Sequence, residues 1–200
     1  MIRLLAPLSV ASLLAFSTSA MAQTTTATDE QAPSTDSQLD LGQQVTEGPQ
    51  LGERYSKGQH GDWDLACIKT AGETDPCSLL QILKDDKGNS VAEVSMFRIE
   101  GGGQAVAGAT VIVPLETLLP AQLTITVDGA PGKRYNYTLC NEIGCVAQIG
   151  LTAEDIAAYK KGSTATVSLV PAPAPDQVVS LTMSLKGFTA GYDLVDVVSN

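Results

Sequence analysis

Apolar and polar residues alternate along most of the chain after residue 60. The pattern is clearest at residues 123–127 (LTITV) and 179–185 (VSLTMSL), where every second position is apolar. A period of two places one side of a β-strand in a core and the other in water. Segments of this texture predict strands at Asp62–Ile68, Ser78–Lys84, Val91–Ile99, Ala105–Val113, Gln122–Val127, Arg134–Cys140, Cys145–Ile149, Thr164–Val170 and Val178–Leu185.

Short turn sequences separate these strands. Asp85–Asn89, Gly101–Gly103, Asp128–Gly132 and Asn141–Gly144 are rich in the glycine, aspartate and asparagine that tight turns favour. Strands joined by such turns pair as antiparallel hairpins. We therefore expect a mainly β domain, an antiparallel β-sandwich or open barrel of about eight or nine strands with one short helix.

That helix is predicted at Thr152–Gly162. The segment begins with a capping threonine, has acidic residues early and lysines late, and ends at a glycine. These signals mark both ends of a helix. Ile156 and Tyr159 are expected to face the sheet, with the helix crossing from one sheet edge to the other. The Pro171–Pro175 run then predicts a stiff surface loop, because proline has no amide hydrogen for a ladder.

Residues 1–22 have the pattern of a secretory signal peptide. Arg3 precedes an apolar run, and Ala20 and Ala22 form a cleavage site before Gln23. The run is too short to cross a bilayer as a helix, which takes about 20 apolar residues. We expect an exported protein of the periplasm, with the cell surface or secretion into the medium as the alternatives.

The mature chain is expected to have two parts. Residues 23–59 are rich in Thr, Ser, Pro and acid, with isolated apolar positions that have no sustained period. Such a segment buries too little apolar surface to offset its conformational entropy, so it predicts a disordered spacer. Residues 60–195 have the length of one domain and are expected to form the β fold.

The charge of the chain argues against nucleic acid as a partner. The formal net charge is −10, and the basic residues are scattered apart from Lys133-Arg134 and Lys160-Lys161. Phosphate backbones are bound by clustered lysine and arginine, which this chain lacks. No later run is long enough for a transmembrane helix after signal removal.

Catalytic and metal-binding patterns are weak. The only histidine is His60, no Gly-x-Ser-x-Gly motif is present, and the cysteines have no histidine neighbours for zinc. Lys87 stands where a calcium loop needs a ligand, and Gly101–Gly103 does not open a helix as a phosphate loop does. A pair of carboxylates in a cleft stays open as an alternative, but we expect no enzyme, no metal and no cofactor.

The four cysteines are the remaining candidates for chemistry. An oxidising compartment favours disulfides, and the local spacings favour Cys67 with Cys77 and Cys140 with Cys145. The segment CNEIGC at residues 140–145 places its cysteines across a predicted hairpin, whereas redox pairs are usually Cys-x-x-Cys at a helix start. The alternatives are a long-range pairing such as Cys67 with Cys140, and a reactive dithiol formed by Cys140 and Cys145.

Together these motifs resemble the invasion-associated locus B family of exported α-proteobacterial proteins. The resemblance covers nearly all of residues 60–194. It rests on Trp63, Cys67, Cys77, Pro114-Leu115, Asp128, Cys140-x-x-x-Gly144-Cys145-x-Ala147 and Ser184-Leu185-Lys186-Gly187-Phe188. Glu116 departs from the glycine that the family often has after the proline-leucine, and the spacer is long.

The resemblance implies a disulfide-bearing, β-sandwich-like domain in the periplasm or at the cell surface, in a family associated with virulence. It supplies no catalytic residues. The shared positions are expected to be structural, with Trp63 as a core or edge aromatic, Gly144 as the turn residue, Gly187 as a strand end and Phe188 as a core residue.

We therefore predict a non-enzymatic interaction module whose partner is an unknown envelope or host-surface protein, in an oligomeric state that the sequence leaves open. Two alternatives are a periplasmic thiol-disulfide enzyme that uses Cys140 and Cys145, and a small-ligand carrier. The expected contact surfaces are the Gly101–Gly103 turn, the Pro171–Pro175 loop and the aromatics Tyr135, Tyr137 and Tyr192, which are expected to be exposed.

Overall fold

The computed structural model describes residues 40, 42–45, 48–101 and 103–199. The predicted signal peptide and residues 23–39 of the predicted spacer lie outside this part of the chain. By its internal packing the chain divides into residues 1–46 and residues 47–200, and the second unit contains all of the strands and helices described below.

The larger sheet is built almost entirely from antiparallel neighbours. Its strand order is β1-β2-β3-β4-β5-β9-β8, and β12 adds to β4 in parallel. The strands are β1 (Arg54–His60), β2 (Trp63–Ile68), β3 (Cys77–Lys84), β4 (Ser90–Glu100), β5 (Ala107–Val113), β8 (Leu139–Asn141), β9 (Gly144–Leu151) and β12 (Val197–Ser199).

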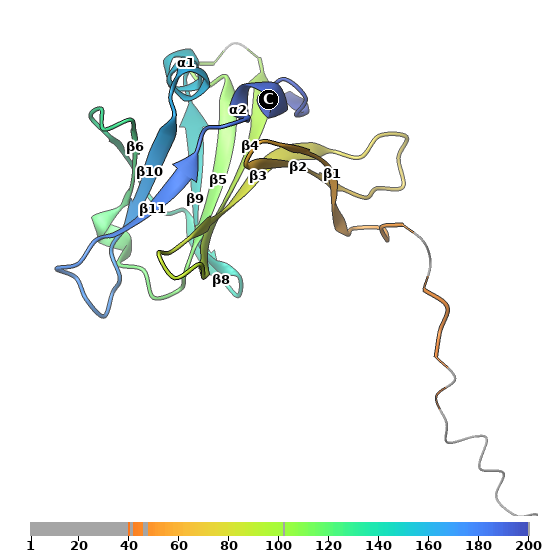
Figure 1. Ribbon diagram of the computed structural model, residues 1–200, viewed down its shortest axis with the longest axis horizontal. Helices are drawn as coiled ribbons and strands as arrows, with labels where there is room; N and C mark the ends of the chain where they lie inside the picture. Colours follow the sequence, from red (N-terminus) through yellow and green to blue (C-terminus); the bar gives the residue numbers. More distant parts are fainter. Residues whose placement is uncertain (1–39, 41, 46–47, 102, 200) are drawn as a thin grey trace, which may run out of the picture. The chain divides into compact units, whose positions relative to one another are not determined.

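The smaller sheet packs against the inner face of the larger one, as Figure 1 shows. Its order is β11-β10-β6-β7, all antiparallel, with β6 (Leu123–Val127), β7 (Lys133–Tyr135), β10 (Thr164–Leu169) and β11 (Val179–Ser184). Alternate residues of both sheets point into a shared core, for example Leu79 and Leu83 from β3 and Val167 and Leu169 from β10. This confirms the predicted mainly β, sandwich-like fold with its short helix.

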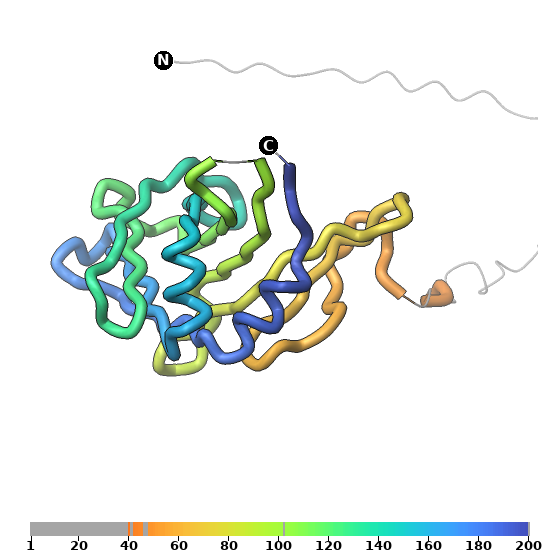
Figure 2. Tube along the Cα trace, turned by 90° about the horizontal axis from the view of Figure 1, so that it is seen from above, coloured from red at the N-terminus to blue at the C-terminus, as the bar shows by residue number. Residues whose placement is uncertain are grey.

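Two helices lie side by side at one end of the sandwich, as Figures 1 and 2 show. The first, α1 (Ala153–Lys161), joins β9 of one sheet to β10 of the other. Thr152 accepts a hydrogen bond from the amide of Asp155 while the Asp155 carboxylate accepts one from the amide of Thr152, a capping box. Ile156 and Tyr159 are buried, as the sequence predicted.

The second helix, α2 (Phe188–Tyr192), carries an aromatic group into the core. The Phe188 ring lies edge-on to Trp63 at 5.5 Å between centroids and to Tyr159 at 5.6 Å, and it stacks on Tyr192 at 5.3 Å. Aromatic pairs in such geometries add roughly 0.5–1.5 kcal/mol each beyond the apolar area they bury. Phe188 therefore joins β2, α1 and α2 in one cluster.

Several sequence predictions need correction. Residues 54–59 fall in the predicted spacer but belong to β1, which pairs with β2 through the main chain, so its polar side chains give no apolar signal. Arg134–Cys140 was predicted as one strand but is divided, with β7 in the smaller sheet and β8 in the larger. Tyr192 is predicted to be exposed but is buried against Phe188, and the Lys160 ammonium lies 5.0 Å from the centroid of its ring.

Candidate functional site

The segment CNEIGC forms the β8–β9 hairpin. Cys140 and Cys145 are directly opposite one another across the two strands, and their Sγ atoms are bonded. Gly144 has a φ of 143°, and a Cβ there would collide with the main-chain carbonyl of Val113 and with Ile112. Only glycine fits this backbone and this close approach. The disulfide and Gly144 together hold the hairpin tip against the end of β5.

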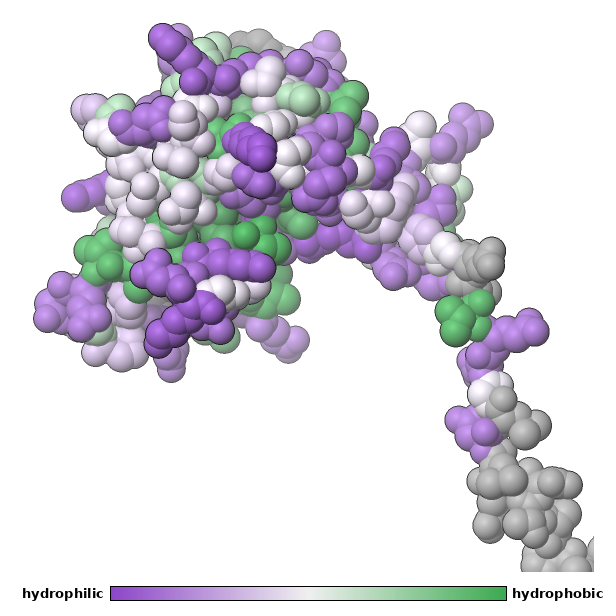
Figure 3. Space-filling model, viewed as in Figure 1, coloured by the Kyte–Doolittle hydropathy of each residue, from purple (hydrophilic) through white to green (hydrophobic). Residues whose placement is uncertain are grey.

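The hairpin tip borders an apolar hollow on the outer face of the larger sheet. The hollow has a volume of about 330 Å³, and its lining includes Ile82, Val91, Ile112, Pro114 and Ile143. Ile143 at the hairpin tip is 69% exposed and Ile82 on β3 is 41% exposed. In Figure 3, green apolar surface lies beside the purple, polar turn that joins β3 and β4. We call this feature the outer hollow.

The lining of the outer hollow is mostly aliphatic, with one ion pair. Its charged lining residues are Arg54 and Glu93, which form an ion pair with 2.9 Å between Nη1 and Oε2. Ser90 lines the hollow but forms no hydrogen bond to a base among the described residues. The outer hollow therefore consists of aliphatic side chains and one ion pair whose two charges neutralise each other.

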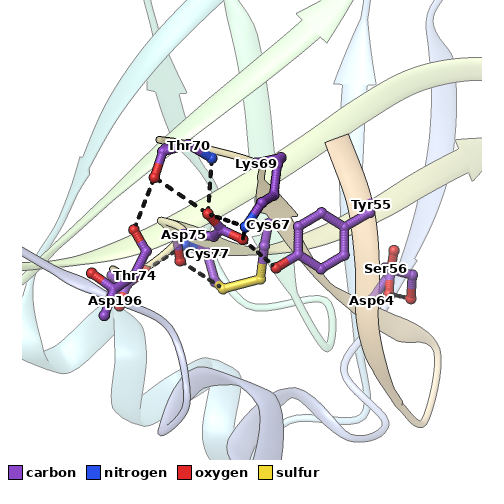
Figure 4. Close-up of a disulfide and its surroundings, with 10 residues drawn as sticks. All are labelled: Tyr55, Ser56, Asp64, Cys67, Lys69, Thr70, Thr74, Asp75, Cys77 and Asp196. Carbon is purple, nitrogen blue, oxygen red and sulfur yellow. Dashed lines mark hydrogen bonds and ion pairs between the residues drawn. A yellow bond between two sulfur atoms is a disulfide. The ribbon is translucent and has the colours of Figure 1, made fainter. Parts of the chain in front are cut away.

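The Cys67–Cys77 disulfide lies in a different setting, the core side of β2 and β3 (Figure 4). Both cysteines are buried. The amide of Cys77 donates to the carboxylate of Asp196, and the amide of Asp196 donates to the carbonyl of Cys77 at 3.2 Å. The disulfide thus lies beside a two-way link between β3 and the segment that leads into β12.

Asp75 organises the loop next to this disulfide. Its carboxylate accepts hydrogen bonds from the amide of Thr70 at 2.8 Å, the hydroxyl of Tyr55 at 2.8 Å and the ammonium of Lys69 at 3.1 Å. The Thr70 amide, followed by the Tyr55 hydroxyl, holds the pKa of Asp75 well below its usual value. The same contact with Asp75 raises the pKa of Tyr55. These interactions hold the loop together.

The other candidate catalytic groups have structural roles. His60 pairs with Trp63 in the β1–β2 ladder and has no side-chain hydrogen bond to an acid or a nucleophile in the described chain. Asp85 accepts hydrogen bonds from Lys87 and Asn89 within its own turn, and Asp155 caps α1. Among residues 40, 42–45, 48–101 and 103–199, no three His, Cys, Asp or Glu side chains gather in a way that would hold a metal.

The remaining positions of the predicted motif also support the architecture. Trp63 donates from Nε1 to the carbonyl of Ser184. Asp128 has a φ of 46° and accepts amide hydrogens from Ser163 and Thr164, which ties the end of β6 to the start of β10. Gly187 is predicted as a strand end but is instead the N-cap of α2, with a φ of 86°, because β11 already ends at Ser184. Ala147 is buried in β9.

Several of the predicted contact surfaces are less exposed or less free than expected. Pro171 pairs with Thr117, and the Ala172 amide donates to the Glu116 carbonyl at 2.8 Å, so the start of the proline loop is anchored to another loop. Tyr135 and Tyr137 are half-buried rather than exposed. Of the triple glycine, Gly102 lies outside the described residues.

Three residues that the sequence does not single out organise parts of the structure: Gln81, Asp75 and Asp196. The side chain of Gln81 accepts a hydrogen bond from the amide of Ser184 and donates one to the Ser184 carbonyl. These two bonds link β3 to β11. A signal for Gln81 was present, because it is a polar residue on the inward side of β3 between Leu79 and Leu83. Asp75 and Asp196 act through contacts that only the folded chain creates.

No helix among the described residues has the length and apolar character needed to cross a membrane.

The fold and the site define a disulfide-stapled β-sandwich protein with an apolar surface hollow. A family model described as "Invasion associated locus B (IalB) protein" matches residues 63–196. The chain therefore belongs to the invasion associated locus B family, as its motifs indicated.

Relatives and a solved structure agree with this assignment. Invasion protein B homologs of Brucella abortus, from strain 2308 and from biovar 1 strain 9-941, are each 25% identical over 139 residues, which cover 69% of this chain and 78% of theirs. The crystal structure of invasion associated protein B from Bartonella henselae has the same fold, with a TM-score of 0.55 and 20% identity. That match covers 67% of this chain and 91% of the Bartonella chain.

Proposed function

We propose that this chain is an exported, non-enzymatic interaction module that binds a protein partner of the bacterial envelope through its outer hollow. The observation that carries the proposal is the exposed Ile143 at the tip of a disulfide-closed hairpin, beside the aliphatic lining of the hollow. Large exposed apolar groups that gather on one surface are typical of interaction sites.

Rigidity favours binding at this surface. The cross-strand disulfide and the close approach of Gly144 to Val113 leave the hairpin tip little freedom. A preorganised contact surface loses less conformational entropy on association. Burial of an isoleucine side chain contributes roughly 1.5–3 kcal/mol, enough for Ile143 to be an energetic centre of the contact.

Export is part of the proposal. The N-terminal 22 residues have the charged, apolar and small-residue regions of a signal peptide. Two disulfides and no free cysteine among the described residues suit an oxidising compartment. Expression of the full chain in a bacterial host, followed by fractionation and mass analysis, is expected to yield a periplasmic protein that begins at Gln23. A cytoplasmic protein with an intact N-terminus would contradict export.

The binding test uses the mature protein with a photo-crosslinking residue in place of Glu142, next to Ile143. A crosslinked envelope protein is identified by mass spectrometry, purified and titrated against the wild type, Ile143→Asp and Leu194→Asp. Leu194 is a matched control, since it is 55% exposed and lies between α2 and β12, away from the hollow. We expect Ile143→Asp to weaken binding about tenfold or more, with Leu194→Asp unchanged. Equal effects of the two variants, or no crosslink from position 142, would refute the proposed surface.

A further inference from the structure

A second hollow lies between α1 and the β6–β7 hairpin, on a different part of the molecule from the outer hollow. It has a volume of about 110 Å³ and is lined by residues from β6, β7 and α1, among them Ile125, Lys133, Tyr135, Asp155 and Tyr159. It adjoins a more open hollow that shares Val127, Ala130 and Ala158 as lining residues. We call the smaller space the tyrosine hollow.

Two tyrosine hydroxyls in the lining form no hydrogen bond within the described part of the chain. Tyr159 is only 3% exposed, yet its hydroxyl forms no hydrogen bond in the described part of the chain. The hydroxyl of Tyr135, on the facing strand, likewise has no hydrogen-bond partner among the described residues. Both hydroxyls belong to side chains that line the hollow, so each is free to exchange a hydrogen bond with water or with a small molecule there. The fully buried unpartnered hydroxyl among the described residues is that of Tyr137, which does not line the hollow.

The charged groups of the tyrosine hollow neutralise one another. The Lys133 ammonium lies 2.6 Å from the Asp155 carboxylate, which also accepts the amide of Thr152. Burial raises the pKa of Asp155, but the contacts with Lys133 and Thr152 outweigh it and leave the pKa below its usual value. Burial, followed by the nearby Asp155 charge, raises the pKa of Tyr135 to about 12. Burial also raises the pKa of Tyr159, so both tyrosines are neutral hydroxyl donors and acceptors at neutral pH.

The remaining walls are apolar. Ile125, Val127, Pro131 and Ala158 supply aliphatic surface beside the two tyrosine rings. The volume of about 110 Å³ exceeds the roughly 10–15 Å³ that one water molecule requires. The hollow thus combines apolar walls, a neutral total charge and two free hydroxyls at a size that suits a molecule of few heavy atoms.

We infer that the tyrosine hollow is a binding site for a small neutral molecule with an apolar ring or chain and one hydroxyl group, of the phenol or alcohol class. The ligand hydroxyl exchanges hydrogen bonds with Tyr159 and Tyr135, and the apolar part packs on Ile125, Pro131 and Ala158. A charged ligand is disfavoured because it would compete with the Lys133–Asp155 pair. This inference is independent of the proposed protein partner, since the two hollows share no lining residue.

The test compares phenol with toluene, which has the same ring but no hydroxyl, by amide-resolved NMR titration of the mature protein. We expect phenol to shift the amides of α1 and of the β6–β7 hairpin with a dissociation constant of about 1 mM, as expected for so few heavy atoms. Toluene is expected to bind at the same place more weakly.

Tyr159→Phe is the decisive variant, because it removes the hydroxyl and keeps the ring that packs on Phe188. We expect it to weaken phenol binding about fivefold or more and to leave toluene binding unchanged. Tyr192→Phe is the matched control, since Tyr192 also packs on Phe188 but does not line the hollow. Thermal unfolding of each variant checks that the fold is retained.

Three outcomes would overturn the inference. Phenol shifts that map elsewhere on the protein would remove the site. Equal weakening of phenol and toluene by Tyr159→Phe would show a packing defect without hydroxyl recognition. The absence of any shift at phenol concentrations far above the expected constant would mean that water alone fills the tyrosine hollow.

Discussion

The indole Nε1 of Trp63 donates a hydrogen bond to the main-chain carbonyl of Ser184 at 2.8 Å. Trp63 belongs to β2 of the larger sheet and Ser184 to β11 of the smaller one, so this contact joins the two layers through the core. The same carbonyl also accepts from Gln81 at 3.0 Å. The two sheets are therefore connected by directional contacts as well as by apolar packing.

Replacement of Trp63 by phenylalanine tests the strength of that connection. The variant loses the donor to Ser184 and leaves space beside Phe188, so we expect it to lower the free energy of unfolding by about 2–3 kcal/mol. Trp63 is the only tryptophan, so urea unfolding must be followed by circular dichroism rather than fluorescence. Tyr192→Phe, which keeps its ring on Phe188, serves as the control with little expected change. A Trp63→Phe variant as stable as the wild type would contradict the role assigned to this contact.

Gly144 and Gly129 provide a matched pair of glycine substitutions. Both have positive φ values, 143° and 76°. A Cβ at Gly129 would meet nothing within 4 Å, whereas one at Gly144 would collide with the Val113 carbonyl. Gly129→Ala is expected to cost only backbone strain, about 1 kcal/mol. Gly144→Ala is expected to cost at least about 2 kcal/mol more, because the β8–β9 hairpin must also move away from β5.

Chemical denaturation measures both glycine variants. Equal losses of stability would mean that the conformation of Gly144, and not its close approach to Val113, is what requires glycine there.

Local signals account for the parts of the fold that the sequence predicted well. The ends of α1 were identified because Thr152, the early acidic residues and Gly162 all act within a single short segment. The alternation in β6 and β11 was recognised because each strand buries one face in the core. The β8–β9 hairpin followed from the spacing of Cys140 and Cys145.

Long-range packing accounts for what the sequence did not reveal. β1 is polar and pairs through its main chain, β12 joins β4 in parallel from far along the sequence, and α2 owes its place to Phe188. The outer hollow brings Ile82, Ile112 and Ile143 together from three separate segments. The tyrosine hollow likewise depends on how α1 meets the β6–β7 hairpin, which no local motif encodes.

The two disulfides are expected to differ in what they contribute. The Cys67–Cys77 bond closes a sequence separation of 10 between two buried cysteines, and the Cys140–Cys145 bond closes one of 5 between an exposed and a buried cysteine. By the loop-entropy model, replacement of each pair by alanine is expected to lower stability by about 3 and about 2 kcal/mol respectively. Loss of the Cys67–Cys77 pair removes two buried side chains and loss of the other pair removes one, so both measured effects are expected to exceed the model values, the first by more.

Denaturation and binding together distinguish these roles. Two double variants are compared, each folded at the temperature of the assay. The one that lacks the Cys140–Cys145 disulfide is expected to weaken partner binding at Ile143 more than the one that lacks the Cys67–Cys77 disulfide. The reverse order would argue against a preorganised hairpin as the contact surface.

Asp75 gives the fold a specific dependence on pH. The Thr70 amide, the Tyr55 hydroxyl and Lys69 stabilise its charged form, so its pKa in the folded protein is depressed. An aspartate in the unfolded chain titrates near pH 4. The contribution of Asp75 is therefore complete above the unfolded pKa and is lost progressively as the pH falls toward the folded one.

We expect Asp75→Asn to lower the thermal midpoint at pH 7 and to differ progressively less from the wild type as the pH is reduced to about 3. Asp86→Asn, an exposed residue in the β3–β4 turn, is the control. A gap between Asp75→Asn and the wild type that stays constant from neutral to acid pH would mean that the network in Figure 4 depends on shape and hydrogen-bond count, and not on the charge of Asp75.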